Sequence, residues 1–282
     1  MNVTSSTDDD LGYIIQWLKE QFDDVEGIGF WGNRNLIRRS HEEDRDMWVV
    51  REGGNAIAFQ IGKYSPDITC VKDTHQGNGY GTALFKAGLE RAYSDGVVRL
   101  SGDCMPETSL PFWQKMGFRQ TAPSGGIGRG IPVEMWLPKS LTLPEGEEAL
   151  SVEVELFVVP ERALYGKAVE PLAKAKPQAR LLKGQTRVYL AERFHIPDRE
   201  EASGDPALRV LVNGEQIYFD KAKYPEAAQL GVQFDPLGNR FMDFLNVPAL
   251  CVSITTETLS QRSLRAGQVL VCGPYLPRYC SR

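Results

Sequence analysis

The sequence predicts an α/β domain over residues 1–139, a linker over residues 140–149 and a β-rich second domain over residues 150–282. Strand-like and helix-like segments alternate through the first region, which is typical of an α/β domain. The next segment is rich in Pro, Gly and Glu, and this composition indicates a linker. Beyond it, short β-branched and aromatic runs are separated by turn signals, and this pattern predicts strands.

The composition excludes several classes of protein. The chain is 42% hydrophobic and 24% charged, which is ordinary for a globular protein, and 282 residues suit two domains. The formal net charge is −5, so we expect no nucleic-acid partner. The N-terminal residues lack a basic region and an apolar run, and no stretch approaches 18 apolar residues. We therefore expect neither a secretory signal nor a membrane partner.

The five cysteines form no recognisable framework. Their number is odd and their spacing is irregular, so the sequence predicts neither a disulfide scaffold nor a metal site. Cys272 and Cys280 could pair. A reducing, cytoplasmic setting is the simplest expectation.

Periodicity defines the elements of the first domain. Apolar residues between Leu11 and Phe22 recur three and four positions apart, which predicts an amphipathic helix behind three aspartates. Residues 47–52 and 56–63 are predicted to be strands joined by a Gly-Gly-Asn turn, and residues 67–71 a third strand. The elements expected after these are a helix from Gly81 to Ala92, a strand at 97–103, a short helix within 106–118 and a strand at 131–137.

Six runs in the second region have strand character, and one helix is expected between residues 160 and 175. The expected strands are residues 151–159, 186–194, 208–214, 215–219, 251–257 and 268–273. We recognise no family resemblance in this region.

The stretch His75–Phe85 holds glycines at positions 77, 79 and 81, directly before the apolar helix pattern. Glycine inside a helix costs about 0.5–1 kcal/mol relative to alanine, so three glycines indicate a need for bare backbone. One interpretation is a simple helix-entry turn. A nucleotide loop fits poorly, because no Lys-Ser/Thr pair follows and the dinucleotide fingerprint lacks its third glycine. A third interpretation is a cradle in which the free N–H groups of a helix start bind phosphate.

The residues around these glycines resemble the acyl-CoA loop of the GNAT superfamily of N-acetyltransferases. Gln76, Gly79 and Gly81 fill the fixed positions of its Q/R-x-x-G-x-G/A pattern, and Val71 stands where the family's fourth strand ends. The segment PFWQKMGF resembles a later helix of the family, which often ends in Gly-Phe. The resemblance covers about half of the chain and implies a GNAT-like mixed sheet flanked by helices.

The resemblance implies that acetyl-CoA is the co-substrate. Backbone N–H groups of the glycine loop would hold its pyrophosphate, and the main chain at the end of the fourth strand would pair with pantetheine like an added strand. In the family, the fourth and fifth strands splay apart at this point. The residues expected to bind acetyl-CoA are Cys70, Val71, Gln76, Gly77, Asn78, Gly79, Tyr80, Gly81 and Thr82.

Two departures from the family pattern affect the acid step of catalysis. Trp113 replaces a tyrosine that lies near the thioester sulfur in many members, and Pro106 replaces an asparagine at the start of the same helix. An indole N–H donates a hydrogen bond but is a poor acid. Trp113 therefore either orients the sulfur or serves only as a core anchor, and water can protonate the thiolate.

A base must take a proton from the acceptor amine, and a carboxylate or a water chain usually does so. Asp67, beside the third predicted strand, is the base that we select, although a solvated surface charge is the simpler reading of any one acid. The other candidates are Asp73, Glu134, His41 and His75. Cys104 has no evident activator in the sequence, so we expect a structural role for it.

The segment after the first helix is acidic, which favours a cationic amine acceptor, either a small molecule or a peptide. Phe30 and Trp31 are candidate walls of the acceptor site. The acidic residues are Asp23, Asp24, Glu26, Glu42, Glu43 and Asp44.

Taken with the loop, these features predict an N-acetyltransferase in which the amine attacks the thioester directly. The alternative is a non-catalytic acyl-CoA-binding or protein-interaction module. The second domain could cover the acceptor cleft, bind a partner or mediate self-association, for example in a homodimer.

Overall fold

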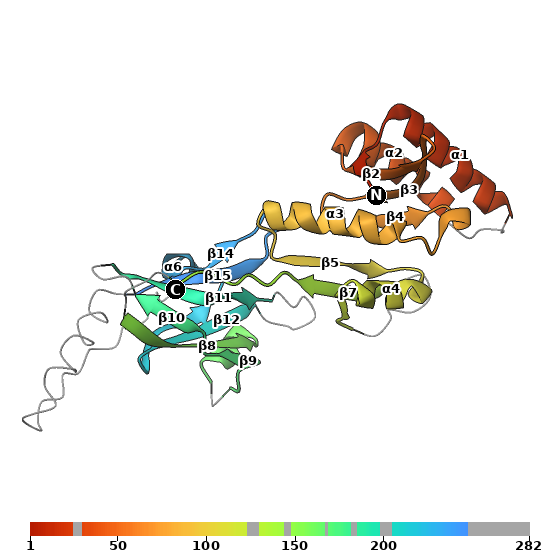
Figure 1. Ribbon diagram of the computed structural model, residues 1–282. Coiled ribbons are helices and arrows are strands. Elements are labelled where there is room, and N and C mark those ends of the chain that lie inside the picture. The colour runs from red at the N-terminus through yellow and green to blue at the C-terminus, as the bar shows by residue number, and fades with distance from the viewer. Residues whose placement is uncertain are drawn as a thin grey trace, which may run out of the picture.

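The computed structural model describes residues 1–24, 30–122, 130–143, 148–166, 169–181, 185–197 and 205–247 (Figure 1). Two of the strands expected from the sequence, 251–257 and 268–273, lie outside the described residues, as does the expected Cys272–Cys280 pair.

The first half is built on a four-stranded antiparallel sheet in the order β1-β2-β3-β4. A β2–β3 hairpin turns at Gly53 and Gly54, which have positive φ, as the Gly-Gly-Asn signal predicts. The strands are β1 (Val3–Ser5), β2 (Met47–Glu52), β3 (Asn55–Ile61) and β4 (Ile68–Val71).

Two long helices cover the opposite faces of this sheet. Helix α1 (Asp8–Asp24) buries Ile14, Trp17 and Leu18 in the cluster that contains Phe59 of β3. Helix α3 (Tyr80–Ser94) packs Leu84 against Ala58, the neighbour of Phe59 that points to the other face. The predicted apolar faces of both helices are thus confirmed.

A second, three-stranded sheet follows in the order β5-β7-β6 (Arg99–Cys104, Ile131–Trp136 and Arg119–Gln120). β4 pairs with β3 and β5 pairs with β7, but the two sheets share no ladder. The fourth and fifth strands of the resemblance, β4 and β5, therefore splay apart as expected. Helix α3 bridges the opening, because its Phe85 packs into the core of the second sheet.

Short helices complete this half. They are η1 (Phe30–Asn33), α2 (Arg34–Arg39), the π-helix η2 (Ser40–Asp44), η3 (Asp73–His75), η4 (Glu107–Ser109) and α4 (Leu110–Lys115).

The second half is β-rich, as predicted, with the order β13-β12-β8-β10-β11-β15-β14 and with β9 paired to β8. Strand β8 passes between two layers, because Val152–Val158 pair with β12 and Glu148–Ser151 pair with β10. The strands are β8 (Glu148–Val158), β9 (Ala173–Ala175), β10 (Gln178–Leu181), β11 (Arg187–Ile196), β12 (Pro206–Val212), β13 (Glu215–Lys221), β14 (Gln233–Phe234) and β15 (Arg240–Asn246), with helices α5 (Glu161–Leu164) and α6 (Pro225–Leu230).

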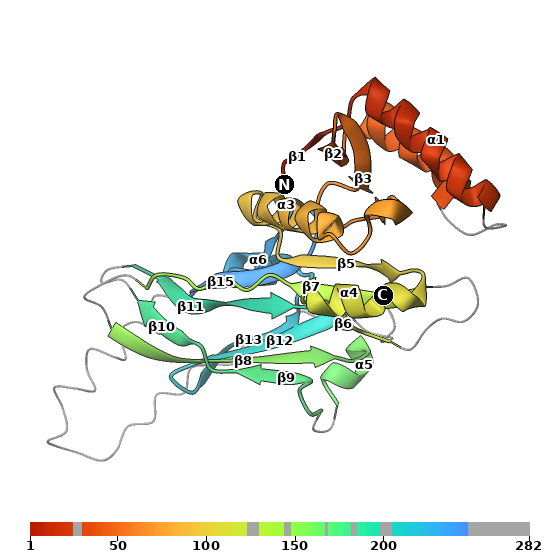
Figure 2. The same ribbon diagram turned by 45° about the vertical axis from the view of Figure 1, so that its right-hand side comes forward.

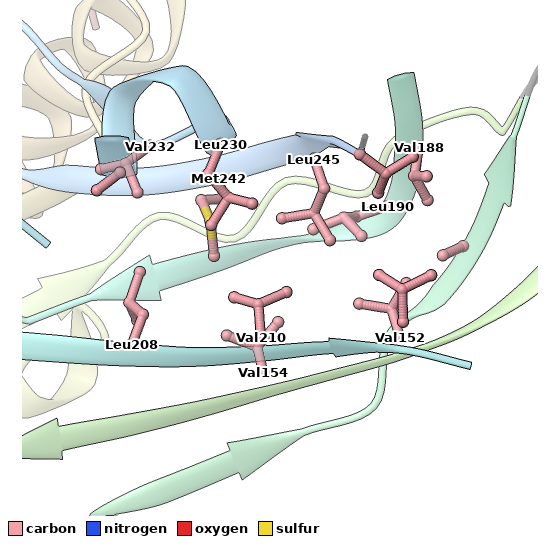
Figure 3. Packing of buried hydrophobic residues seen from close by; sticks show 14 of the residues in the cluster. Val152, Val154, Val188, Leu190, Leu208, Val210, Leu230, Val232, Met242 and Leu245 are labelled. Atoms are coloured by element: carbon pink, nitrogen blue, oxygen red, sulfur yellow. The ribbon is translucent and has the colours of Figure 1, made fainter. Parts of the chain in front are cut away.

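One apolar cluster fills the space between these two layers (Figure 3). Leu208 and Val210 of β12 point toward Met242 and Leu245 of β15, and all four are fully buried. This cluster is the core of the second half.

The two halves meet where the chain that follows β7 runs along β11 (Figure 2). Leu141 N–H donates to Ala191 O of β11 at 2.8 Å, and the Trp136 and His195 rings lie 4.7 Å apart. Val98 N–H donates to the Asp235 carboxylate at 2.9 Å. The first residues of the segment predicted as a linker thus contact the second half, and the division into two domains stays a prediction.

Candidate functional site

A cleft of about 990 Å³ lies where β4 and β5 splay apart, and we call this opening the fork. Its walls come from β4, the glycine loop, the end of β5 and α4. The fork is closed at one end by Ser65, whose hydroxyl donates to Ser101 O at 2.8 Å and accepts from Ser101 N at 3.1 Å. Beyond this clamp the two sheets separate.

The glycine loop brings bare backbone to one end of the cleft. Gly77 and Gly79 have φ of +79° and +85°, a conformation that side-chain-bearing residues rarely adopt. Gly79 is the N-cap of α3, and no side chain caps the helix. The first N–H groups of a helix have no partner within it, so this end of the cleft offers donors and a positive dipole end to an anion.

Side chains around the loop hold its shape. Gln76 donates through Nε2 to Val71 O at 3.3 Å and to Asp73 Oδ1 at 2.7 Å. Glu52 of β2 contacts the loop twice, through His75 Nε2 at 3.1 Å and the Tyr80 hydroxyl at 3.2 Å. The loop is therefore fixed before any ligand arrives.

Most residues expected to bind acetyl-CoA line the cleft. They are Val71, Gln76, Gly77, Gly79, Tyr80, Gly81 and Thr82. Cys70 and Asn78 are not among the lining residues. Cys70 packs on the α1 face of the sheet, where burial and then Asp73 raise the pKa of its thiol to about 12. Asn78 donates to His75 O at 3.1 Å, so it supports the loop.

The edge of β4 offers main-chain groups to the fork. Lys72 N–H donates to Ile57 O of β3, whereas Val71 O points the other way and accepts from Gln76. In an antiparallel pair, the N–H and C=O groups of successive residues point alternately toward and away from the partner strand. The main chain of Val71 therefore faces away from β3. An extended ligand that carries amides can pair with such an edge.

Trp113 is both a core residue and a wall of the cleft. Its ring lies 6.0 Å from Phe85, 5.4 Å from Phe118 and 4.9 Å from Phe112, each in an edge-on arrangement. The indole is half-buried and borders the cleft, as does Pro106. The position of Trp113 is therefore compatible with both roles that the sequence left open, namely orienting the thioester sulfur and anchoring the core.

Of the five candidate bases, Asp67 and His75 line the cleft. Partial desolvation raises the pKa of the Asp67 carboxyl, and the Asp46 carboxylate adds to this effect. A raised pKa makes a carboxylate a stronger base, which suits proton transfer. His75 is held by Glu52 and by the Thr74 hydroxyl at 2.8 Å.

The other three candidates have structural partners. Glu134 is buried and pairs with Arg99 at 2.9 Å and Arg119 at 2.6 Å. His41 is buried between the Ser6 hydroxyl and the Asp8 carboxylate. Asp73 accepts from Gln76. Cys104 is buried against the Ser109 hydroxyl at 3.1 Å, in keeping with the structural role expected for it.

The acceptor side of the cleft differs in part from the sequence interpretation. Phe30 lines the cleft, but Trp31 packs against the α1 core and carries Arg34 over its ring at 5.1 Å. Glu43 and Asp44 lie 3.8 and 3.4 Å from Arg39, which offsets part of the expected acidity. The side chains of Asp23, Asp24 and Glu26 lie outside the described residues.

Among the lining residues that sequence reasoning did not assign to the site are Thr69, Asp103 and Lys115. A signal for Asp103 was present. The order strand-helix-strand predicts that β4 and β5 are parallel. In the structure Ser65 contacts Ser101, and the residues two positions further along each strand direction, Asp67 and Asp103, flank the opening together.

Among the described residues, there is no group of three or more His, Cys, Asp or Glu side chains that could hold a metal ion. None of the helices in that part of the chain combines the length and the apolar character needed to cross a bilayer.

Several solved structures of acetyltransferases are similar to about half of this chain. The PaiA N-acetyltransferase of Thermoplasma acidophilum, solved with coenzyme A, is 15% identical, with 48% of this chain and 98% of that chain covered and a TM-score of 0.37. The ribosomal-protein-S18-alanine N-acetyltransferase of Escherichia coli is 13% identical, with 52% and 98% covered and a TM-score of 0.37. A GNAT-family acetyltransferase of Staphylococcus aureus Mu50 is 10% identical, with 48% and 98% covered and a TM-score of 0.39.

No curated protein matched the chain. The family model described as the acetyltransferase (GNAT) domain matches residues 43–120, which run from η2 through β6 and include the glycine loop and the helix with Trp113. Residues 43–120 of this chain are thus similar to the GNAT acetyltransferase domain.

Proposed function

We propose that the protein is an acetyl-CoA-dependent N-acetyltransferase. The observation that carries this proposal is the fork, where an uncapped helix N-terminus, left-handed glycines and an unpaired strand edge border one cleft. These are the features that a ligand with a pyrophosphate and an amide-bearing arm requires. The GNAT family match over the same residues supports it.

The residues of the fork have distinct roles in this proposal. The loop Gly77–Gly81 binds the pyrophosphate, and the edge of β4 pairs with pantetheine. Asp67 accepts the proton of the acceptor amine, whose nitrogen attacks the thioester carbonyl carbon. The carbon–sulfur bond then breaks, and the thiolate takes a proton from water, because the Trp113 indole cannot supply one.

The test is release of free CoA thiol from acetyl-CoA across a panel of small amines and peptides. We expect at least one amine to give thiol release together with an acetylated product. Gly79→Glu places a carboxylate where the pyrophosphate binds, so acetyl-CoA affinity should fall at least tenfold, about 1.4 kcal/mol. Unchanged affinity in a folded Gly79→Glu variant would rule out the loop assignment.

A non-catalytic acyl-CoA-binding module is the second candidate. It is favoured by Trp113 and Pro106, which replace polar family residues at the acid position and at the start of that helix. Acetyl-CoA that binds to the wild-type protein without thiol release on any amine would support this module over the enzyme.

A further inference from the structure

The tip of the glycine loop, residues 76–79, is exposed to solvent and has little packing of its own. A β-carbon built on Gly77 would meet no other atom within 4 Å, and one built on Gly79 would meet only the Met1 side chain, at 3.9 Å. Glycine also has more backbone freedom to lose on ordering than any other residue. A loop with this composition keeps a single shape only when its two ends are held.

One carboxylate, that of Glu52, contacts both ends of the tip. Its Oε2 lies 3.1 Å from Nε2 of His75, the residue directly before the tip. Its Oε1 accepts from the hydroxyl of Tyr80, the first residue of α3, at 3.2 Å. The His75 and Tyr80 rings lie 6.3 Å apart, so the three side chains form a closed triangle. Glu52 belongs to β2, which is paired on both sides, so the triangle is attached to the sheet.

The partners in this triangle define where its protons lie. A carboxylate only accepts hydrogen bonds, so the Tyr80 hydroxyl and His75 Nε2 are the donors. Desolvation and the Glu52 carboxylate raise the pKa of the Tyr80 hydroxyl, which therefore keeps its proton. With Nε2 as a donor, Nδ1 of neutral His75 accepts from the Thr74 hydroxyl, 2.8 Å away. Both ring nitrogens are thus engaged in holding the loop, which favours Asp67 over His75 as the base.

We infer that Glu52 is a positioning residue of the acyl-CoA site, because it holds both ends of the glycine loop in the shape that receives the pyrophosphate. This inference rests on the proposed function, which assigns the loop to acetyl-CoA. Glu52 is not among the residues that line the cleft, whereas His75 and Tyr80 are, so Glu52 acts through these two side chains. A loop that is ordered in advance binds more tightly, because less freedom is lost on binding.

The negative charge of Glu52 acts in the opposite direction, because it repels the phosphates. The side chain is 57% exposed, however, and water and salt screen the charge of an exposed group. The N–H of His75 and the O–H of Tyr80 also point at the carboxylate and offset part of its field. We therefore expect the ordering of the loop to outweigh the repulsion.

Glu52→Ala removes both contacts and tests the inference. We expect the Kd for acetyl-CoA, measured by calorimetry, to rise about tenfold, since the free loop must then be ordered on binding. At saturating acetyl-CoA, kcat should stay at the wild-type value, because Glu52 contacts the loop and not the proposed base, Asp67. The unfolding midpoint in urea should change little, because the side chain is exposed.

Glu52→Gln separates position from charge. The amide oxygen can accept from His75, and the amide nitrogen can donate to the Tyr80 hydroxyl oxygen, so both contacts are kept while the charge is lost. We expect an acetyl-CoA affinity within about twofold of the wild type. Glu90→Ala, at an exposed position of α3, is the matched control and should also bind like the wild type.

Wild-type affinity or tighter binding in folded Glu52→Ala would overturn the positioning role. So would an equal loss in Glu52→Gln, because the charge and not the contacts would then be responsible. If Glu52→Ala fails to fold, Tyr80→Phe removes one of the two contacts, and an unchanged affinity in that variant would overturn the inference. A wild-type protein that does not bind acetyl-CoA would instead reject the proposed function.

Discussion

The two halves of the molecule use β-structure in opposite ways. In the second half, two layers close over one apolar cluster, in which Leu208 and Val210 face Met242 and Leu245. In the first half, two sheets separate, and the separation leaves one edge of β4 without a neighbouring strand and the start of α3 without a side-chain cap. A closed sheet gains stability from burial, whereas an open one gains a place to bind. The cleft thus lies where two neighbouring strands, β4 and β5, do not pair with each other.

Asp67→Asn should have the largest effect and tests whether the open half performs chemistry. The amide keeps the shape of the carboxylate but cannot take a proton, so kcat should fall about 10²–10⁴-fold at unchanged acetyl-CoA affinity. Steady-state assays measure kcat, and calorimetry measures the affinity for acetyl-CoA. Asp103→Asn is the matched variant on β5. If it shows the large loss instead, the base lies on the other arm of the fork.

Leu190→Ala tests whether the closed half contributes to the site. Leu190 is fully buried in the second core, so the variant should lose about 2–5 kcal/mol of unfolding free energy. Urea denaturation measures this loss, and Leu172→Ala at an exposed position is the control. Acetyl-CoA affinity of the folded variant should stay at the wild-type value. A weakened affinity would show that the two halves are coupled.

His195 gives the junction between the halves a pH dependence. Burial and the neighbouring Arg193 lower its pKa from 6.5 to about 4, despite the opposing Asp243 carboxylate. The unfolded chain therefore binds a proton that the folded protein excludes, and stability falls as pH drops from 6.5 toward 4. The loss should be on the order of 1–3 kcal/mol.

His195→Phe keeps a ring against Trp136 and should flatten this part of the stability curve. Denaturation midpoints measured at several pH values provide the comparison. Curves for variant and wild type that run parallel across this window would show that His195 does not titrate as described.

Trp113→Tyr should have the smallest effect. Tyrosine restores the family's ionisable group, with a pKa of about 10, at a site where the ring packs against Phe85 and Phe118. Acetyl-CoA affinity should be kept and turnover should be equal or raised. A folded variant that binds acetyl-CoA but loses turnover more than tenfold would reveal a role of the indole itself.

Local patterns predicted much of the open half. The α3 face could be predicted because Leu84, Phe85 and Ala92 recur at helical spacing. The glycine loop could be predicted because glycine is unfavourable within a helix, so three glycines before the helical pattern indicate exposed backbone. Helix α2 and the π-helix after it were missed, because Arg34–Asp44 is mostly charged and has no apolar period.

Partners distant in sequence could not be predicted. Glu134 looked like a candidate base until Arg99 and Arg119 were found beside it. Glu52 lies at the end of a strand pattern, and nothing local shows that His75 and Tyr80 lie beside it. In the second half, β15 was missed although Arg240–Asn246 alternates in part, because its pairing with β11 joins residues about 50 positions apart.

The unpaired edge of β4 also bears on solubility. An open strand edge is a template on which another copy of the chain can add a strand, and this is a route to aggregation. β4 has only four residues, and Pro66 and Lys72 bracket it, both of which disfavour the growth of such a pairing. The strand is thus long enough to accept one short extended ligand and too short to nucleate a fibril.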